Sequence, residues 1–167
     1  LIKDGMKLLF KKRKIFSTYF ETTTLNMFND SVEGVLPRKK IRVRHYPDSS
    51  SNYSLEIKYS SIEGRFKKSN EISLSDHKRY LQNGIFDNLY GICMPLLEVI
   101  YEREYFQIGG IRVNFDKNIL YRSFNNRKTE KVDDWFVVEI KAPAHISIDY
   151  LKSLVLAPRK RFSKFSN

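Results

Sequence analysis

A short basic stretch, "KIRVRHY", alternates Lys and Arg with apolar residues, a pattern that could bind an anion. In an extended strand, alternate side chains point to opposite faces, so Lys40, Arg42 and Arg44 would share one face, about 7 Å apart. Such a row can simply face water, as the charged face of a half-buried antiparallel strand usually does. It can also bind a chain of phosphates, because Arg forms paired hydrogen bonds to phosphate oxygens and Lys adds a compact positive charge. The other strands must decide between the two interpretations.

Five further stretches repeat this alternation of a charged face with an apolar or aromatic one. Their charged faces carry Glu56 and Lys58, Arg65 and Lys67, Arg103, Arg112, and Glu139 and Lys141. An ordinary solvated face would mix the two signs evenly, whereas positive charge dominates here. If the sheet closes on itself, these faces converge in the interior, where an anion must offset the cost of burying like charges. The carboxylates would then suit Mg²⁺ or Mn²⁺, which bridge to phosphate oxygens.

The sequence predicts that about seven strands, mostly antiparallel, carry these side chains. Turn signals lie at "PDSSSN", at Gly64 and at the Gly109–Gly110 pair. Two short helices are expected, in "SLSDHKRYLQNG" with Ser75 as the N-cap and in "SIDYLKSLV" with Ser147 as the N-cap. "DGMKLLFKKRK" is predicted to be a turn or helix end, and "NNRKTEKVDD" a charged loop. Residues 1–167 are expected to form one mostly β domain, a sandwich or barrel.

The composition limits the classes of partner. Thirty Lys and Arg residues stand against nineteen Asp and Glu residues, a formal net charge of +11. This excess favours a nucleic acid, an anionic membrane or a phosphate-rich small molecule. Nucleic acid is disfavoured, because the basic residues alternate with apolar ones on strands and do not form an exposed aromatic and basic platform. No stretch approaches 18 apolar residues, so no transmembrane helix is expected.

The single cysteine, Cys93, rules out an internal disulfide and suits a reducing compartment, so a cytoplasmic location is expected. Cys93 lies in the apolar run "GICMPLLEVI", where a small buried residue is expected in place of a nucleophile. His45 falls on the apolar side of its strand and is expected to be packed. Trp135 begins a strand and is expected in the core.

The charged strands occur in an order that matches a known family. The sequence resembles the VTC domain, the polyphosphate polymerase branch of the triphosphate tunnel metalloenzymes in the CYTH-like superfamily. The matching stretches are "STYFETT", "KIRVRHY", "LEIK", "KK" at Lys67–Lys68, "YERE", "IRVNFD", "VEIK" and "RFSKF". Each is weakly specific alone, but the ordered set covers nearly the whole chain and is strongly specific.

The resemblance implies an antiparallel β-barrel with short flanking helices, whose bore forms a basic tunnel that holds a polyphosphate. It implies an enzyme that transfers the γ-phosphate of ATP to a growing polyphosphate chain, with Mn²⁺ or Mg²⁺ as the cofactor. ATP and inorganic polyphosphate or triphosphate are the implied partners. Such a reaction needs no protein nucleophile, because aligning donor and acceptor and neutralising the developing charge supply most of the catalysis.

Position by position, the resemblance also implies roles for individual residues. Arg42 and Arg44 match the paired tunnel arginines, and Arg103 and Arg112 match those of the later hairpin; these four are the expected catalytic residues. Glu139 matches the metal-ligand glutamate, and Glu56 is added to it by parity. The expected phosphate-binding lysines are Lys58, Lys67 and Lys164, with Lys40 and Lys141 added because they share the charged faces.

The chain departs from the family pattern at two points. Glu21 stands where the family usually has Asp in "YFDT". Family members also begin with a strand of acidic and basic tunnel residues followed by a helix, and we expect that first strand to be missing from this chain.

The sequence is also compatible with two functions related to polyphosphate synthesis. A triphosphatase would use the same tunnel with water as the acceptor, and a non-catalytic domain would only bind polyphosphate.

Overall fold

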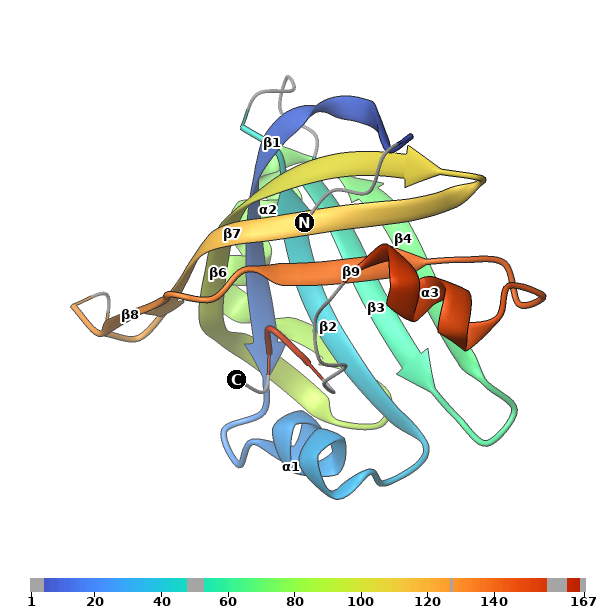
Figure 1. Ribbon diagram of the computed structural model, residues 1–167. Helices are drawn as coiled ribbons and strands as arrows, with labels where there is room; N and C mark the ends of the chain where they lie inside the picture. Colours follow the sequence, from blue (N-terminus) through green and yellow to red (C-terminus); the bar gives the residue numbers. More distant parts are fainter. Residues whose placement is uncertain (1–4, 48–52, 127, 156–161, 166–167) are drawn as a thin grey trace.

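The computed structural model describes residues 5–47, 53–126, 128–155 and 162–165. Most of these residues form strands, and three helices lie at the margins of the sheet (Figure 1). In chain order the elements are β1 (Lys7–Glu21), α1 (Asn26–Glu33), β2 (Arg38–His45), β3 (Tyr53–Ser60), β4 (Arg65–Ile72), α2 (Leu74–Asn83), β5 (Ile85–Asp87), β6 (Gly91–Ile108), β7 (Ile111–Ser123), β8 (Glu130–Asp133), β9 (Val137–Lys141) and α3 (Ile148–Leu154).

The strands form one antiparallel sheet in the order β4-β3-β2-β1-β6-β7-β8, with β5 paired to β6 and β9 paired to β7. The sheet curls, so that β7 and β9 run across the front of β1 and β2 in Figure 1, while α2 lies behind. We call the surface inside this curl the concave face. Its side chains include Tyr19, Lys40, Arg42, Arg44, Glu56, Lys58, Lys67, Tyr101, Arg103, Asp116, Glu139 and Lys164.

Strand β2 is buried on both faces. On its outer face, Ile41 and Val43 join a core cluster that also contains Met27 of α1 and Ile85 of β5. On its concave face, Arg42 and Arg44 are each only 8% exposed. A solvated charged face would leave its arginines in water, so the structure excludes that interpretation for this strand.

The prediction of a closed barrel is wrong, because the sheet remains open between β4 and β9. Within the described part of the chain, β4 pairs only with β3 and β9 pairs only with β7. Side chains of β4 are exposed along nearly its whole length. Alternation along a strand predicts which side chains share a face, but closure depends on strand tilt and stagger, which alternation does not encode.

Four local predictions are also corrected. From Lys7 on, "DGMKLLFKKRK" is the first half of β1 and not a turn or helix end, because β6 pairs with it through several register shifts. The loop predicted in "NNRKTEKVDD" contains β8, and Trp135 beside it is 78% exposed instead of buried. The N-cap of α2 is Ser73 and not Ser75, because Ser73 and Asp76 form a reciprocal capping box. Ser147 caps α3 as predicted.

Glu21 at the end of β1 acts as a cap for helix α1. Its carboxylate accepts hydrogen bonds from the backbone N–H groups of Thr22 (2.7 Å), Met27 (3.1 Å) and Phe28 (2.8 Å). The residue at the N-cap position, Leu25, makes no side-chain cap hydrogen bond. Glu21 is 1% exposed, so it satisfies buried donors that water does not reach. Its place in the "YFET" motif is therefore explained by the fold.

We expect Glu21→Ala to lower the free energy of unfolding by about 3 kcal/mol, because three backbone donors would lose a charged acceptor. Urea unfolding followed by circular dichroism measures this change. Glu33→Ala, at the exposed C-terminal end of the same helix, is the matched control and is expected to change stability by less than about 0.5 kcal/mol. Equal effects of the two substitutions would contradict the capping role.

Candidate functional site

Strand pairing places the predicted basic residues in rungs across β2, β3 and β4. Arg42 lies opposite Glu56, and two residues further along, Lys40 lies opposite Lys58. Lys58 in turn lies opposite Lys67 on β4. Because side chains two residues apart share a face, successive rungs lie about 7 Å apart along the concave face. The predicted parity of these residues is confirmed.

A first cluster forms around Glu56. One oxygen of Glu56 accepts from Arg42 Nε at 2.8 Å, and the other lies 3.2 Å from Lys67 Nζ and 3.7 Å from an Arg44 nitrogen. Arg42 also donates to the hydroxyl of Tyr19 at 2.9 Å. Glu56 is 4% exposed, so its carboxylate holds three cations in place within a largely buried site.

The charges in this first cluster change the acidity of its members. Burial alone would raise the pKa of Glu56, but Arg42 and Arg44 lower it to about 2. Burial would likewise raise the pKa of Tyr19, yet the same two arginines lower it overall. The pKa of Arg42 is raised, because Tyr19 and Glu56 outweigh the effect of burial. At neutral pH Glu56 is therefore ionised and Arg42 is protonated.

A second cluster lies on the opposite side of the concave face, around Asp116. Arg103 donates to both oxygens of Asp116, at 2.5 and 2.8 Å, and Lys164 donates to one of them at 2.5 Å. Asp116 is fully buried. Burial would raise its pKa, but hydrogen bonding from Arg103 and the charge of Lys164 lower it overall. Lys164 thus brings the segment 162–165 onto the concave face.

Tyr101 connects the two clusters. Its hydroxyl accepts from Arg44 at 3.1 Å, while Arg103 and Lys164 lie 5.4 Å and 4.6 Å from the centre of its ring. Burial raises the pKa of Tyr101 to about 12, so the phenol stays neutral. The sequence analysis did not identify Tyr101 as a site residue. Its spacing of two residues from Arg103, which places both side chains on one face of the strand, was the available signal.

Glu139 on β9 is the most available carboxylate of the concave face. Its side chain is 42% exposed, and its oxygens lie 3.3 Å from Arg103 and 3.5 Å from Lys141. The amide nitrogen of Asn114 donates to it at 3.3 Å, while the buried Oδ1 of Asn114 has no hydrogen-bond partner among the described residues. Burial would raise the pKa of Glu139, but Arg103 and Lys141 lower it overall. Glu139 is therefore ionised and has longer contacts than Glu56 or Asp116.

Two more of the predicted lysines, Lys58 and Lys40, lie on the same face of the sheet. Lys58 is reached by solvent, yet its pKa is lowered by burial and by the positive charge of Arg42. Both observations fit a side chain inside an open concavity, where water and protein atoms both surround it. Lys40 donates to the hydroxyl of Ser163 at 2.9 Å.

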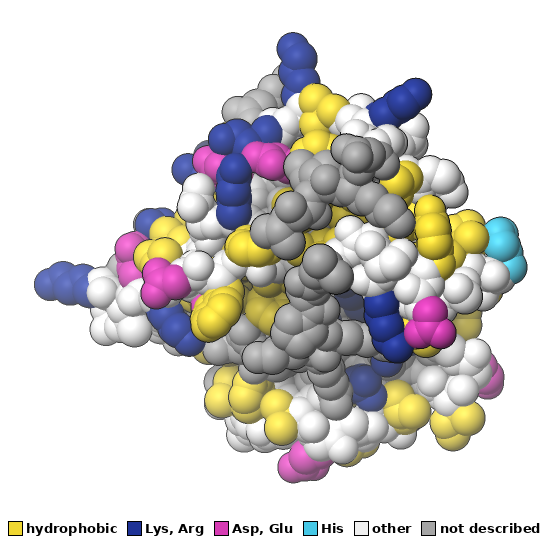
Figure 2. All heavy atoms as spheres, viewed as in Figure 1, with side chains coloured by type: hydrophobic (Ala, Val, Ile, Leu, Met, Phe, Trp, Pro, Cys, Tyr) yellow, Lys and Arg dark blue, Asp and Glu magenta, His cyan; other side chains and the backbone are white. Residues whose placement is uncertain are grey.

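Arg112 is not brought into either cluster. It is exposed near the tip of the β6–β7 hairpin, opposite Lys141, and forms no ion pair within the described ranges. In its place, Arg103 links Asp116 to Glu139. The surface seen in Figure 2 carries further Lys and Arg side chains, interspersed with smaller acidic and apolar groups.

The predicted metal ligands Glu56 and Glu139 belong to different clusters and do not meet. Among the residues that the structure describes, no group of three or more His, Cys, Asp or Glu side chains could hold a metal ion. The oxygens of Glu56 are taken by cations. Glu139 and Asn114 Oδ1, which has no partner in the described ranges, offer oxygens that fit Mg²⁺ or Mn²⁺. These ions commonly take one or two protein ligands together with substrate phosphates.

Cys93 is fully buried, and burial raises the pKa of its thiol to about 11. The prediction of a structural cysteine is therefore confirmed. His45 is packed as predicted, between the rings of Phe16 and Tyr53. None of the described helices is long and apolar enough to cross a membrane.

Glu56 gives the stability of the protein a defined pH dependence. Its pKa is lower in the native state than in the unfolded state, so its contribution is complete above about pH 4.5 and is lost as the pH falls towards 2. The expected loss is about 3 kcal/mol. Glu56→Gln should be less stable than the native protein at neutral pH and should lack this part of the pH dependence, as measured by urea unfolding across this range.

Glu63→Gln is the control for this pH dependence, because Glu63 lies exposed in the β3–β4 turn. It is expected to leave the pH dependence unchanged. A Glu56→Gln variant with the same pH dependence as the native protein would contradict the role of Glu56 as the carboxylate that holds the cations.

The sheet is antiparallel and curled, and its concave face gathers arginines and lysines from separate strands. This arrangement is the one expected of a triphosphate-tunnel fold. A sequence model of the VTC domain matches residues 6–92 and 91–167, nearly the whole chain. The chain therefore belongs to the VTC domain family.

One solved structure that the chain resembles is a candidate adenylate cyclase from Bacillus halodurans. The two share 12% sequence identity and a TM-score of 0.62, over 93% of this chain and 91% of that chain. At this level of identity, the likeness shows a shared fold alone. No curated protein matches the chain in sequence.

Proposed function

We propose that this domain transfers the γ-phosphate of ATP onto a polyphosphate chain bound along the concave face. The observation that supports this proposal is the convergence of Arg42, Arg44 and Arg103 on one continuous surface. Arg42 and Arg44 both contact Glu56, and Tyr101 connects Arg44 to Arg103. Three fixed guanidinium groups on a partly closed surface suit a ligand with many negative charges along its length. Membership in the VTC domain family supports the same class of ligand.

Each cluster of the concave face would have a separate task in this reaction. Arg42 and Arg44 would hold phosphates on the β2 side, and Arg103 would hold those on the β7 side. Their positions are fixed in advance by Glu56 and Asp116, so little reorganisation is needed when charge develops on the transferring phosphoryl group. Lys58 and Lys67, which solvent reaches, would neutralise the incoming chain.

A divalent cation would be held by Glu139, with Asn114 Oδ1 as a second oxygen donor. When bound, Mn²⁺ or Mg²⁺ would supply charge neutralisation at the phosphate oxygens. Glu56 is assigned instead to holding the cations, because its two oxygens already contact Arg42, Arg44 and Lys67.

A polyphosphate-binding domain without catalysis is the second candidate function. It is favoured by the lack of a three-ligand metal cluster in the described part of the chain. The two candidate functions predict different products from ATP. Both require the basic side chains to bind polyphosphate.

The deciding experiment incubates the purified protein with ATP and Mn²⁺ and separates the products by gel electrophoresis. The proposed function predicts a ladder of polyphosphate chains together with ADP. ADP and free phosphate without a ladder would indicate a triphosphatase, and unchanged ATP would indicate a binding domain; either result would overturn the proposal.

Two neighbouring residues of β4 provide a matched control for this assay. Lys67 lies on the concave face beside Glu56, whereas Lys68 lies on the opposite face, paired with Ile57. Lys67→Ala and Lys68→Ala change the net charge equally. Only Lys67→Ala is expected to slow polymer formation. If both substitutions slow it equally, the substrate is attracted by the net charge of the protein and not by Lys67 itself.

A further inference from the structure

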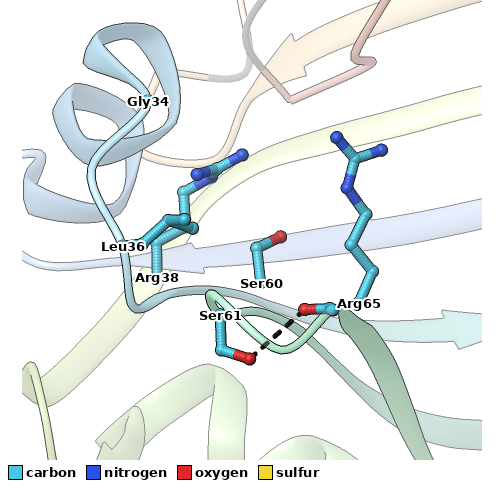
Figure 3. Close-up of a pocket in the computed structure, with 7 residues that line it drawn as sticks. Gly34, Leu36, Arg38, Ser60, Ser61 and Arg65 are labelled. Atoms are coloured by element: carbon cyan, nitrogen blue, oxygen red, sulfur yellow. Dashed lines mark hydrogen bonds between the residues drawn. The ribbon is translucent and has the colours of Figure 1, made fainter.

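The rungs of the concave face continue beyond the residues assigned so far. One rung past Lys40, Lys58 and Lys67, strand pairing sets Arg38 opposite Ser60, and Ser60 opposite Arg65. These three side chains have the same parity as the cations of the proposed site, and Figure 3 shows them on the same side of their strands. The row of basic side chains thus extends to the end of β2, β3 and β4.

This outer rung lines a surface pocket of about 430 Å³. The pocket lies between the end of α1 and the β3–β4 turn, and Arg38, Arg65, Ser60 and Ser61 supply its polar side chains. Gly64 in the turn has a φ of 150°, which favours glycine, and the turn is held by hydrogen bonds between the backbones of Ser61 and Gly64. No acidic side chain is among the residues that line it.

The two arginines are available to a ligand in this pocket. Arg38 donates to the carbonyl oxygen of Val35 at 2.9 Å, which fixes the direction of its guanidinium group. Within the described residues, neither Arg38 nor Arg65 forms a salt bridge, in contrast to Arg42 and Arg103 in the main clusters. Two arginines without carboxylate partners, with serine hydroxyls between them, form a suitable site for a phosphate group.

We infer that this pocket, with Arg38 and Arg65 as its binding residues, is an outer phosphate-binding subsite for the distal part of a polyphosphate chain. The inference rests on the proposed function, because it continues the same row of cations. Two rungs, about 13 Å of strand, separate Arg38 from Arg42. Tripolyphosphate is too short to span both rungs, so only longer chains would reach the pocket from the main site.

The test compares tripolyphosphate with long-chain polyphosphate as ligands, by calorimetry in metal-free buffer at fixed ionic strength. Arg65→Ala is the informative variant, because the side chain of Arg65 is exposed and its removal breaks no ion pair among the described residues. Arg65→Ala is expected to weaken binding of the long chain about tenfold and to leave tripolyphosphate binding within about twofold. Lys68→Ala, on the opposite face of the same strand, is expected to change neither.

Several results would overturn this inference. Unchanged affinity of Arg65→Ala for the long chain would show that the chain does not reach the pocket. Equal losses for both ligands, or an equal loss in Lys68→Ala, would show a general effect of charge. If the native protein binds neither ligand, the proposed function fails as well, whereas binding of both ligands without an effect of Arg65→Ala removes the outer subsite alone.

Discussion

Glu139→Gln is expected to lower turnover of ATP with Mn²⁺ at least about 100-fold while leaving metal-free binding of tripolyphosphate unchanged or tighter. The substitution keeps the size of the side chain and removes its charge. A carboxylate among cations repels phosphate, but it attracts a divalent cation that in turn contacts phosphate oxygens. Glu139 is suited to this role because its contacts with Arg103 and Lys141 are long and its side chain is 42% exposed.

Glu104→Gln is the matched control for this prediction. Glu104 follows Arg103 on β6, points to the other face and pairs with Lys117 at 2.6 Å. The same change of charge there should leave both turnover and binding near the native values. If Glu139→Gln instead loses metal-free affinity for tripolyphosphate, then Glu139 holds the cations together and is not a metal ligand.

Arg42→Ala is expected to weaken the binding of tripolyphosphate about 10- to 150-fold, the loss of one charge-assisted hydrogen-bonding group. Arg42 is 8% exposed and held by Glu56 and Tyr19, so its guanidinium group needs no ordering when the anion binds. Calorimetry without metal measures the effect. Arg42→Lys keeps the charge but loses the paired donors of the guanidinium group. Its affinity for tripolyphosphate should therefore lie between those of the native protein and Arg42→Ala.

Removing Arg42 also leaves Glu56 with fewer partners, so thermal unfolding must first show that each variant is folded. Arg122→Ala provides the control, since Arg122 forms ion pairs with Glu98 and Glu130 outside the two clusters. A folded Arg42→Ala variant that binds tripolyphosphate as tightly as Arg122→Ala does would contradict the assignment of Arg42 to phosphate binding.

The sequence was sufficient to predict which side chains share the charged face. Alternation in β2 and β3 places Arg42, Arg44 and Glu56 together, because side-chain direction along a strand has a period of two. The Gly109–Gly110 turn was also predictable, since both residues have positive φ values, which glycine adopts without strain.

The partners of the carboxylates could not be predicted from the alternation of side chains along the strands. Parity placed Glu56 among the cations but did not reveal that its oxygens contact three of them. Asp116 was not identified as a site residue from the sequence, and its partners are Arg103 from the neighbouring strand and Lys164 from the C-terminal segment. These pairings depend on register and long-range packing, which the local sequence does not specify.

The alternation of side chains also could not predict that the sheet stays open at its edge. The exposed side chains of β4 and the irregular pairing of β1 with β6 are set by how the strands twist and meet. Arg112 illustrates the same limit, because parity gives the face of a strand but not how far along it the concave face extends.

Binding of a phosphate chain to the concave face can be seen directly in a crystal structure of the protein with tripolyphosphate. We expect an anion on this face, in contact with Arg42 or Arg44 on the β2 side and with Arg103 on the β7 side. An anion bound only at the outer face of the sheet, or crystals that contain none at saturating tripolyphosphate, would contradict it.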